Sequence, residues 1–587
     1  MVGRIPVIIE RYRDGSSEPG QNAARKSLRV WHLVCYDSNM RNSRFLPVAL
    51  LAVVLSALVG GFYDSVFARQ DEVTQQYRVF TAALAAIDRE YVEEVPSDRL
   101  VYGGIEGMLK TLDPHSSFFD PRQYAQMRER QEGKYYGLGI QIQPIDGDIT
   151  VMSIFEGSPA FKKGLRRGDV IARIESKDAA GKSTMLDAKG MSSEDAVKLL
   201  KGPKGTSVNI SIRRRGYDQL IDLQVTRDEV NIVSVRGYFM IDGETGYLKL
   251  GEFTETSNQE VGAALEALTG KGMKRLVLDL RDNPGGALDQ AIAISNRFLP
   301  RGDLIVYTKG RTRTSDQEYR ATEQSDYTHL PVVVMVNRNS ASASEIVSGA
   351  LQDHDRALVV GETTFGKALV QSVYKINEGA GLALTTGRYY TPSGRMIQRP
   401  WDGAFDEYLT YTLRDQKAER QHSNAELKYT DAGRKVYSGG GIEPDKFMAG
   451  PVEGFSPTKF GRQMWGSGQF QRFADQYMAE GDNRFTAANK SKKRIAKGFT
   501  VTDEMLQDFR AQLTTQKITI DEEAFKTDLG FIKALMHYEI DLALFGVEEA
   551  RRNLILQDPQ AKFALAQFGE AQRLTELARN TTRSGGR

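Results

Sequence analysis

The first pattern along the chain is an uncharged apolar run over residues 45–63. As a helix with a rise of ~1.5 Å per residue it would be ~28 Å long, close to the hydrocarbon thickness of a bilayer. Arg41 and Arg44 precede the run, and residues 66–68 resemble a small-x-small cleavage site. An uncleaved anchor and a cleaved signal peptide therefore both stay open. We expect residues 40–68 to be the export segment, which places the remaining chain in the cell envelope, on its periplasmic or extracytoplasmic face.

Helical spacing follows the export segment. Phe80, Leu84, Ile87 and Tyr91 recur at intervals of three and four, which puts them on one helical face. We predict a helical N-terminal region over residues 69–131.

From residue 132 short β-rich runs appear between glycine turns, with one helical stretch, which predicts a small, partly open β-barrel over 132–228. Its YYGLGIQI segment is a glycine-rich loop that leads directly into a strand. We expect the amides of Leu138, Gly139 and Ile140 to converge and bind a carboxylate, while the strand edge pairs with an incoming peptide. The alternative is that these glycines serve only a hairpin.

After residue 229 strands and helices alternate, and the apolar runs lack period-two alternation. Such strands are covered on both faces, which predicts an α/β core over residues 229–446. Residues 447–587 are predicted to be a helical extension, to which the pattern assigns no role. Residues 1–39 are polar and poorly patterned, and Met40 is a candidate for the true start.

Charge and cysteine content exclude several classes of function. The formal net charge is +2, from 78 basic and 76 acidic residues, so the chain has no electrostatic footprint for nucleic acid. The only cysteine, Cys35, precedes every predicted domain, which excludes disulfides within the chain, a cysteine nucleophile and a thiolate metal site. We expect no metal, no organic cofactor and no nucleic acid partner.

Candidate chemistry begins at NSASASEI, residues 339–346, where a strand runs through small residues into a helix. Active sites of open α/β sheets favour this edge. A hydroxyl on Ser342 would be exposed there, and the Ala343 amide could donate to an oxyanion. The alternative is that Ser340 or Ser342 only caps the helix.

A lysine in an apolar stretch is the second candidate. Lys367 lies in GETTFGKALVQ at the start of a predicted core strand. Burial would lower its pKa from ~10.4, toward the range in which a free amine accepts a serine proton. Gln371 lies four residues on, so on a strand it would share a face with Lys367 and could orient the amine. A snorkelling lysine at a strand end is the alternative.

The third candidate is LDLRDNPGG, where a buried strand turns at Asn283 and two glycines are predicted to open the next helix. The amides of Gly285 and Gly286 could complete an oxyanion hole, because no side chain stands in the way. The alternative is that both glycines serve only the turn geometry.

Together these segments resemble the carboxyl-terminal processing, or tail-specific, proteases, a family of Ser-Lys peptidases. The similarity spans residues 70–446 and rests on the helical lead-in, on YYGLGIQI with GSPAFKKGLRRGDVI, and on the motifs DLRDNPGG, SASASE, LQD, GETTFGK and GGIEPD. It implies a mixed β/α catalytic core of the ClpP/crotonase kind, joined to a PDZ β-barrel and an N-terminal helical cap. It also implies that Ser342 is the nucleophile, Lys367 the general base and Gln371 its support. The C-terminal helical extension is outside the family pattern.

The aspartate of LQD, Asp353, is often named as a third catalytic residue of this family. If residues 342–352 form one helix, Asp353 lies ~16 Å along its axis from Ser342. A carboxylate near Lys367 would also raise the lysine pKa, which works against a base. We therefore expect Asp353 to give structural or charge support only.

The resemblance implies a serine endopeptidase that binds protein C-termini through its PDZ module and cleaves through an acyl-enzyme. We also expect a homo-oligomer, membrane attachment through the N-terminal segment, and a regulatory adaptor as a possible partner. A PDZ module that blocks the site until a tail binds is a further hypothesis.

A non-catalytic PDZ scaffold or chaperone is the alternative from another class. A Ser-His-Asp hydrolase is the chemical rival, but no histidine lies in a matching motif; the six are His32, His115, His329, His354, His422 and His537.

Overall fold

The computed structural model describes residues 74–587 except 178–180, 215, 377–378, 402–407, 409, 415, 417–419, 451, 453, 482–494 and 585–587. The predicted leader and export segment lie outside the described residues. Within those ranges, no helix is both long and apolar enough to cross a membrane. The chain divides into two compact units, Met1–Leu100 and Val101–Arg587. In the first unit a helix covers residues 74–90, as the spacing predicts.

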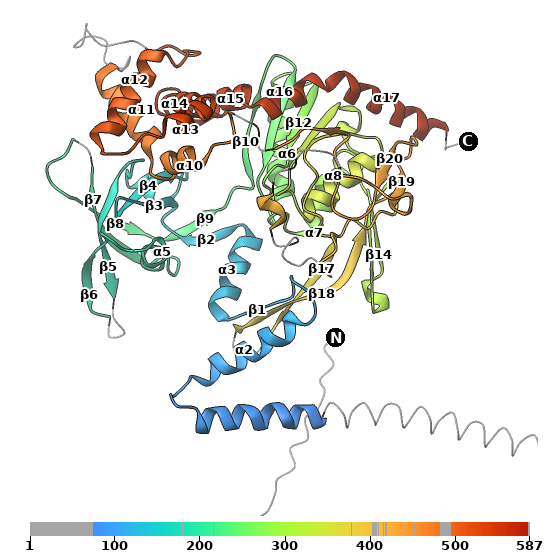
Figure 1. The fold of residues 1–587 in the computed structure, drawn as a ribbon, viewed down its shortest axis with the longest axis horizontal. Helices are drawn as coiled ribbons and strands as arrows, with labels where there is room; N and C mark the ends of the chain where they lie inside the picture. The colour runs from blue at the N-terminus through green and yellow to red at the C-terminus, as the bar shows by residue number, and fades with distance from the viewer. Residues whose placement is uncertain are drawn as a thin grey trace, which may run out of the picture. The chain divides into compact units, whose positions relative to one another are not determined.

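The predicted PDZ module is built on one six-stranded sheet that its hydrogen bonds leave open (Figure 1). It has an apolar core of its own. Its sheet has the order β3-β4-β5-β7-β8, with β6 paired to β5, so β3 is an edge strand. Strands β2 and β9 pair antiparallel in a separate ribbon. The bounds are β2 (Lys134–Gly137), β3 (Ile140–Ile145), β4 (Asp148–Ile154), α4 (Pro159–Lys162), β5 (Val170–Lys177), β6 (Ser183–Asp187), α5 (Ser193–Leu200), β7 (Ser207–Arg213), β8 (Ile221–Thr226) and β9 (Asp228–Asn231).

The α/β core is built on a six-stranded sheet of order β10-β11-β12-β15-β16-β21. The β10–β11 pair is antiparallel and the other pairs are parallel. The strands are β10 (Val235–Met240), β11 (Thr245–Leu250), β12 (Arg275–Asp279), β15 (Val332–Val336), β16 (Leu358–Gly361) and β21 (Lys446–Phe447).

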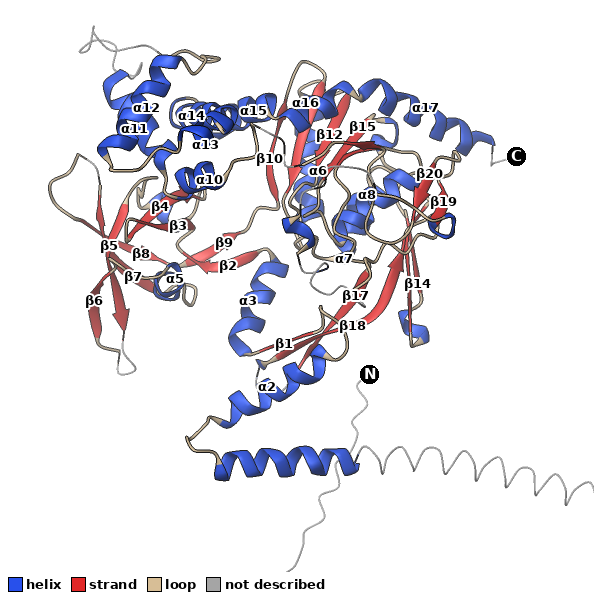
Figure 2. Ribbon diagram, in the orientation of Figure 1, coloured by secondary structure: helices blue, strands red, loops and turns tan. Residues whose placement is uncertain are grey.

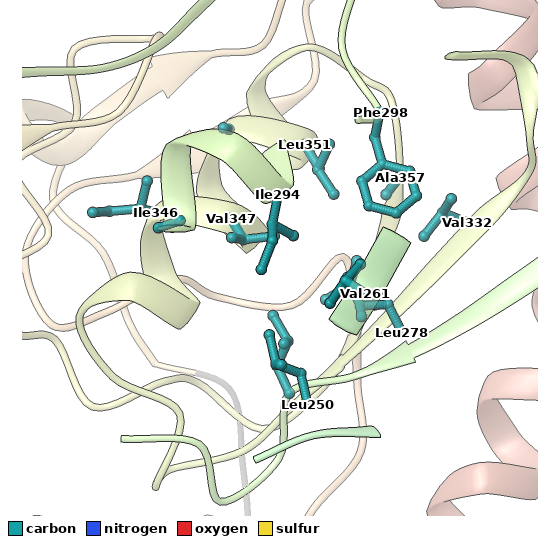
Figure 3. Packing of buried hydrophobic residues seen from close by; sticks show 14 of the residues in the cluster. Leu250, Val261, Leu278, Ile294, Phe298, Val332, Ile346, Val347, Leu351 and Ala357 are labelled. Atoms are coloured by element: carbon teal, nitrogen blue, oxygen red, sulfur yellow. The ribbon is translucent and has the colours of Figure 1, made fainter. Parts of the chain in front are cut away.

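Both faces of this sheet are covered, as its apolar runs predict. On one face α6 (Ser257–Gly270), α7 (Leu288–Asn296) and α8 (Ala343–Asp353) close the main core. Figure 3 shows Val261, Ile294 and Val347 of these helices packed with Leu278 and Val332 of the strands. On the other face lie α16 (Pro559–Ala566) and α17 (Phe568–Ser584), which come from the C-terminal extension (Figure 2).

A second, five-stranded sheet carries part of the site. Its order is β1-β18-β13-β14, and β17 also pairs with β18. The bounds are β1 (Ser117–Phe119), β13 (Leu304–Gly310), β14 (Gln317–Arg320), β17 (Leu369–Lys375) and β18 (Gly381–Tyr390). The N-terminal region is predicted to be helical, and α2 (Ser97–Lys110) and α3 (Pro121–Glu132) fit that prediction. Strand β1 between them does not, because its partner strand lies more than 260 residues further on.

The C-terminal extension is helical, as predicted, and has an aromatic-rich core of its own. Polar contacts connect it to the β-barrel. Arg167 and Asp146 of the barrel form ion pairs with Glu539 and Arg472, and Gln143 Nε2 donates to the Gly466 carbonyl at 2.7 Å. Its first helices are α10 (Lys459–Gly466), α11 (Gln469–Gly481), α12 (Asp503–Thr515), α13 (Glu522–Thr527), α14 (Leu529–Leu544) and α15 (Val547–Gln557). Minor elements are β19 (Leu427–Tyr429), β20 (Lys435–Tyr437), η1 (Arg313–Ser315), η2 (Asp326–His329), η4 (Tyr411–Leu413) and η5 (Asn424–Glu426).

Candidate active site

Ser342 occupies a strained turn between β15 and α8. Its φ is 54°, in the left-handed region, which costs a non-glycine residue about 1–3 kcal/mol unless the surroundings hold it there. The neighbouring serines are used structurally, since Ser340 Oγ donates to the Leu280 carbonyl at 2.8 Å and Ser344 Oγ to the Asn283 carbonyl at 3.0 Å. Ser342 also stands at the N-cap of α8, where Glu345 reaches back to its amide as in a capping box. The alternative that Ser342 only caps the helix therefore stays open.

A buried carboxylate that the sequence interpretation missed fixes this turn. Glu345, in the first turn of α8, is fully buried and accepts the Ser342 amide at 2.8 Å and the Lys367 amide at 2.9 Å on the same oxygen, Oε2. Its other oxygen accepts Thr364 Oγ1 at 2.5 Å and the Gly366 amide at 2.7 Å. Burial raises the pKa of Glu345 to about 7, although these hydrogen bonds lower it.

Tyr389 bridges the same two segments from β18. Its hydroxyl lies 3.1 Å from the Ser342 carbonyl oxygen and 2.6 Å from that of Lys367. The ring is almost fully buried, so the phenol stays neutral, and burial raises its pKa well above the ordinary value. Ser342 and Lys367 are thus brought together by two buried side chains, from α8 and from β18.

Lys367 lies in an extended loop just before β17, not on the strand as predicted. It is partly buried, and burial lowers its pKa below the ordinary value, as expected. The nearby charges of Glu345 and Asp113 act in the opposite direction. The net lowering favours the neutral amine, which is the form that can accept a proton.

Gln371 contacts the lysine directly. Lys367 Nζ donates to Gln371 Oε1 at 2.9 Å, and Gln371 Nε2 donates to the His115 carbonyl at 2.6 Å. The reasoning that a shared strand face brings them together is wrong, because Lys367 precedes the strand and the β17–β18 register shifts between Val370 and Gln371. The predicted contact exists all the same.

The NPGG turn lies against Ser342 but differs from its prediction in two respects. The next helix, α7, begins only at Leu288, so the glycines do not open it. The Gly285 amide is also unavailable to an oxyanion, because it donates to Asn283 Oδ1 at 2.9 Å. A Cβ on Gly285 would lie 2.7 Å from the Cβ of Ser342, so glycine here provides space.

Two amides beside the serine stay without a partner among the described residues, those of Gly286 and Ala343. Gly286 has a φ of 144° and lies against Phe253, whose carbonyl oxygen would be 2.1 Å from an added Cβ. Asn283 joins this turn to the serine turn, since its carbonyl accepts the Ala341 amide at 3.0 Å. The predicted oxyanion hole therefore reduces to Gly286 and Ala343.

Asp353 lies at the far end of α8, which is one unbroken helix. It is buried, pairs with Arg395, and accepts Ser393 Oγ at 2.7 Å. The next residue, His354, binds Asp431 and the Leu304 carbonyl, both at 2.7 Å. Neither side chain contacts Ser342. Asp353 and His354 therefore do not form a Ser-His-Asp triad with Ser342.

Within the described ranges, no group of three His, Cys, Asp or Glu side chains could hold a metal ion.

The glycine-rich loop of the β-barrel has its carbonyl oxygens tied inward. The Leu138 carbonyl accepts the Ala160 amide at 2.9 Å, and that of Gly139 accepts the Phe155 amide at 3.0 Å. Gly139 has a φ of 77°, and a Cβ there would lie 2.2 Å from Ser158, so only glycine fits. Ile140 begins β3, the edge strand. Carboxylate binding by the amides of Leu138, Gly139 and Ile140 stays a prediction.

One sequence signal could have identified Glu345. Ser342 and Glu345 have the S-x-x-E spacing of a capping box, in which the glutamate reaches back to the serine amide. His115, whose backbone carbonyl accepts Gln371 Nε2, carries no comparable sequence signal. Every residue type has a backbone carbonyl, so the sequence cannot mark this contact.

Four family models match the chain. They are peptidase family S41 over residues 244–403, a PDZ domain over 137–225, the N-terminal domain of the activating protease CtpB over 64–122, and a family of unknown function over 460–540. A carboxy-terminal-processing protease of Bartonella bacilliformis is 37% identical over 351 residues, which cover 59% of this chain and 78% of that protein. The chain belongs to the S41 family of serine peptidases.

It is a carboxyl-terminal processing protease with a substrate-binding PDZ domain and a mixed α/β core. The carboxy-terminal processing protease CtpA of Bacillus subtilis is 32% identical to it, over 67% of this chain and 81% of that protein. Among solved structures, a photosystem II D1 C-terminal processing protease is 30% identical, with a TM-score of 0.31 and 54% and 89% coverage. Residues 460–540 of the C-terminal extension match only the family of unknown function named above, so this match assigns the extension no role.

Proposed function

We propose that this protease cleaves by a Ser-Lys dyad, with Ser342 as the nucleophile and Lys367 as the general base. The observation that carries this proposal is the double bridge: Glu345 Oε2 binds both backbone amides, and the Tyr389 hydroxyl lies against both carbonyls. Such a bridge fixes the relative position of two segments 25 residues apart, which proton transfer between their side chains requires.

The reaction we propose starts with a neutral Lys367. Its amine takes the Ser342 proton as the oxygen attacks the substrate carbonyl, and the C–N bond of the tetrahedral intermediate then breaks. The lysine ammonium gives its proton to the leaving amine, which leaves an acyl-enzyme and a neutral lysine again. A water molecule, deprotonated by the same amine, then hydrolyses the ester and restores Ser342.

The amides of Gly286 and Ala343 are our candidates for the oxyanion hole. Both are unsatisfied among the described residues, and Ala343 is the first residue of α8, where the helix dipole favours negative charge. Two backbone donors at this place would stabilise the charge that develops on the substrate oxygen.

Substrate delivery is assigned to the PDZ domain, which binds peptide C-termini. We propose that the carboxylate binds at Leu138–Ile140 and that the chain pairs with the free edge of β3. We also propose an envelope location with an N-terminal anchor, a homo-oligomer, and regulation through the PDZ domain by a tail or an adaptor. The export pattern over residues 45–63 supports the location, and cell fractionation with N-terminal sequencing of the native protein tests it.

The dyad is tested by cleavage of a reporter protein with an apolar C-terminal tail. Ser342→Ala and Lys367→Ala should each lower kcat at least about 1,000-fold, since either change removes a group that bonds or proton transfer require. Amidation of the tail should raise KM and leave kcat intact. Wild-type turnover in the lysine variant would rule out the dyad, and binding without any turnover in the wild-type protein would favour a scaffold.

A further inference from the structure

A tight turn from the N-terminal region contacts Gln371, the residue that binds the Lys367 amine. In this turn, residues Asp113–Ser116, Asp113 Oδ1 accepts the His115 amide at 2.8 Å and the Ser116 amide at 2.7 Å, and Oδ2 accepts Ser116 Oγ at 2.8 Å. Burial raises the pKa of Asp113, but the hydrogen bonds outweigh burial and lower it, so the group is a carboxylate at neutral pH. Pro114 restricts the backbone further. We call this segment the Asp113 turn.

The Asp113 turn is fastened to β17 and β18 at one rung of their ladder. Gln371 of β17 lies opposite Thr385 of β18. The His115 carbonyl accepts Gln371 Nε2 at 2.6 Å, and Ser116 Oγ accepts the Thr385 amide at 3.1 Å. Both ends of this rung are therefore bound by adjacent residues of one turn.

These contacts decide which way the Gln371 carboxamide faces. Because the His115 carbonyl can only accept, it requires the NH₂ group of Gln371. The carboxamide oxygen then points the other way, where it accepts Lys367 Nζ at 2.9 Å. An amine that donates one hydrogen to Gln371 has that N–H bond fixed, which restricts its lone pair to the two remaining tetrahedral positions. If the carboxamide were turned over, its NH₂ group would face the amine and its oxygen would face the His115 carbonyl.

We propose that the Asp113 turn is a positioning element of the dyad, which acts through Gln371 to hold the Lys367 amine in the orientation that deprotonates Ser342. This inference rests on the proposed function of the dyad and assigns a role to a segment outside its motifs. It also accounts for β1, which continues from the turn along β18 and fixes it in register.

Three variants test the turn. Asp113→Ala removes both acceptor oxygens and should lower kcat about tenfold to 100-fold, because a shift of ~1 Å in a reacting group has effects of this size. KM for a tailed substrate should change less than about twofold. Asp113→Asn keeps an acceptor for both amides and should recover most of the lost kcat. Ser116→Ala is a milder change and should also lower kcat. It replaces Asp113→Ala as the test if the Asp113→Ala protein is poorly folded.

A matched control exists in the β10–β11 hairpin. Asp242 accepts the amides of Glu244 and Thr245 at 2.8 and 2.6 Å and Thr245 Oγ1 at 2.9 Å, the same type of turn away from the site. Asp242→Ala should lower the melting temperature but leave kcat within about twofold. An equal loss of kcat in Asp242→Ala and Asp113→Ala would mean a general structural effect and would overturn the positioning role.

The deciding measurement is a double-mutant cycle with Gln371→Ala. If the turn acts through Gln371, Asp113→Ala should have almost no further effect on kcat in the Gln371→Ala background. The same factor in both backgrounds would overturn the proposal. Lys367→Ala, assayed alongside, reports on the dyad separately. If that variant is inactive while Asp113→Ala and Ser116→Ala both keep full kcat, only the positioning role fails; if it is active, the proposed function fails.

Discussion

At the scale of single residues, Glu345 connects more of the site than any candidate residue of the sequence analysis, although it lies within the SASASE motif. It binds the Ser342 and Lys367 amides, and its charge raises the pKa of the lysine that burial lowers. A buried carboxylate with four donors is held in one position, so the serine turn and the lysine loop cannot separate without breaking that set of hydrogen bonds.

Replacement of this carboxylate should change both the rate and its pH dependence. Glu345→Gln removes a charge that favours the lysine ammonium, so the lysine pKa should fall and the acid limb of kcat/KM should move to lower pH. The plateau should also fall about tenfold or more, because a carboxamide cannot accept at both ends. Full pH–rate profiles of the two proteins measure both effects.

The matched control is Glu362→Gln. Glu362 is a buried carboxylate of the same core, but it binds Arg338. Its replacement should lower stability and leave the acid limb in place. An acid limb that stays fixed or moves to higher pH in Glu345→Gln would contradict the electrostatic role of Glu345.

At the scale of elements, the two ends of α8 have different roles: one end holds site residues and the other end anchors the helix in the core. Its first turn carries Ser342 and Glu345, and its last residues are tied to the core by Asp353 and His354. The length of the helix was predictable from the sequence and correctly separates Asp353 from the serine. The strained φ of Ser342 was not, because the serine turn contacts the Asn283 turn and Tyr389 of β18, which are distant in sequence and which no local pattern encodes.

The end of α8 gives a prediction about stability. Burial lowers the pKa of His354, but the hydrogen bonds that its ring donates to Asp431 and to the Leu304 carbonyl outweigh burial and raise the pKa to about 9, from 6.5. A raised pKa means a stabilising contribution that is fully present below pH 6.5 and is lost as pH rises from 6.5 through 9. His354→Ala should therefore cost about 1–3 kcal/mol of unfolding free energy at pH 6 and much less near pH 9.5.

Urea unfolding of both proteins across this range tests the prediction. A cost that is the same at pH 6 and pH 9.5 would mean that His354 contributes by packing alone.

The turns around the site show where sequence patterns stop being informative at this scale. A glycine pair after a strand correctly indicated a turn beside the serine, but Asn283 binds the Gly285 amide and leaves only Gly286 for the oxyanion. Likewise Gln371 reaches Lys367 from across a register shift. Side chains two to four residues away decide which amides and amines are free, and periodicity does not record that.

At the scale of the whole molecule, the C-terminal extension completes the catalytic core. The sequence predicts that the core strands are covered on both faces but not which segment covers the second face. Ala564, Phe568 and Leu574 of α16 and α17 pack on Val333 and Val360 of the sheet. These contacts join segments about 200 residues apart, which a pattern read along the chain cannot connect.

Truncation of one of these side chains should destabilise the core. Phe568 is 4% exposed, with the Arg275 guanidinium 4.9 Å from its ring centre, so Phe568→Ala should cost about 3 kcal/mol or more. Leu577 of the same helix is 48% exposed, and Leu577→Ala should stay within about 0.5 kcal/mol. Denaturant unfolding measures both; equal effects would mean that α17 does not cover the sheet in solution.

The central claim is that a neutral Lys367 activates Ser342, and covalent labelling tests it without any assumption about the natural substrate. A fluorophosphonate should modify Ser342 in the wild-type protein, at a rate that rises with pH as the lysine amine loses its proton. Intact mass measured against time should show the labelling rate falling at least about 100-fold in Lys367→Ala, and no label in Ser342→Ala. Labelling of the Lys367→Ala protein at the wild-type rate would contradict the account.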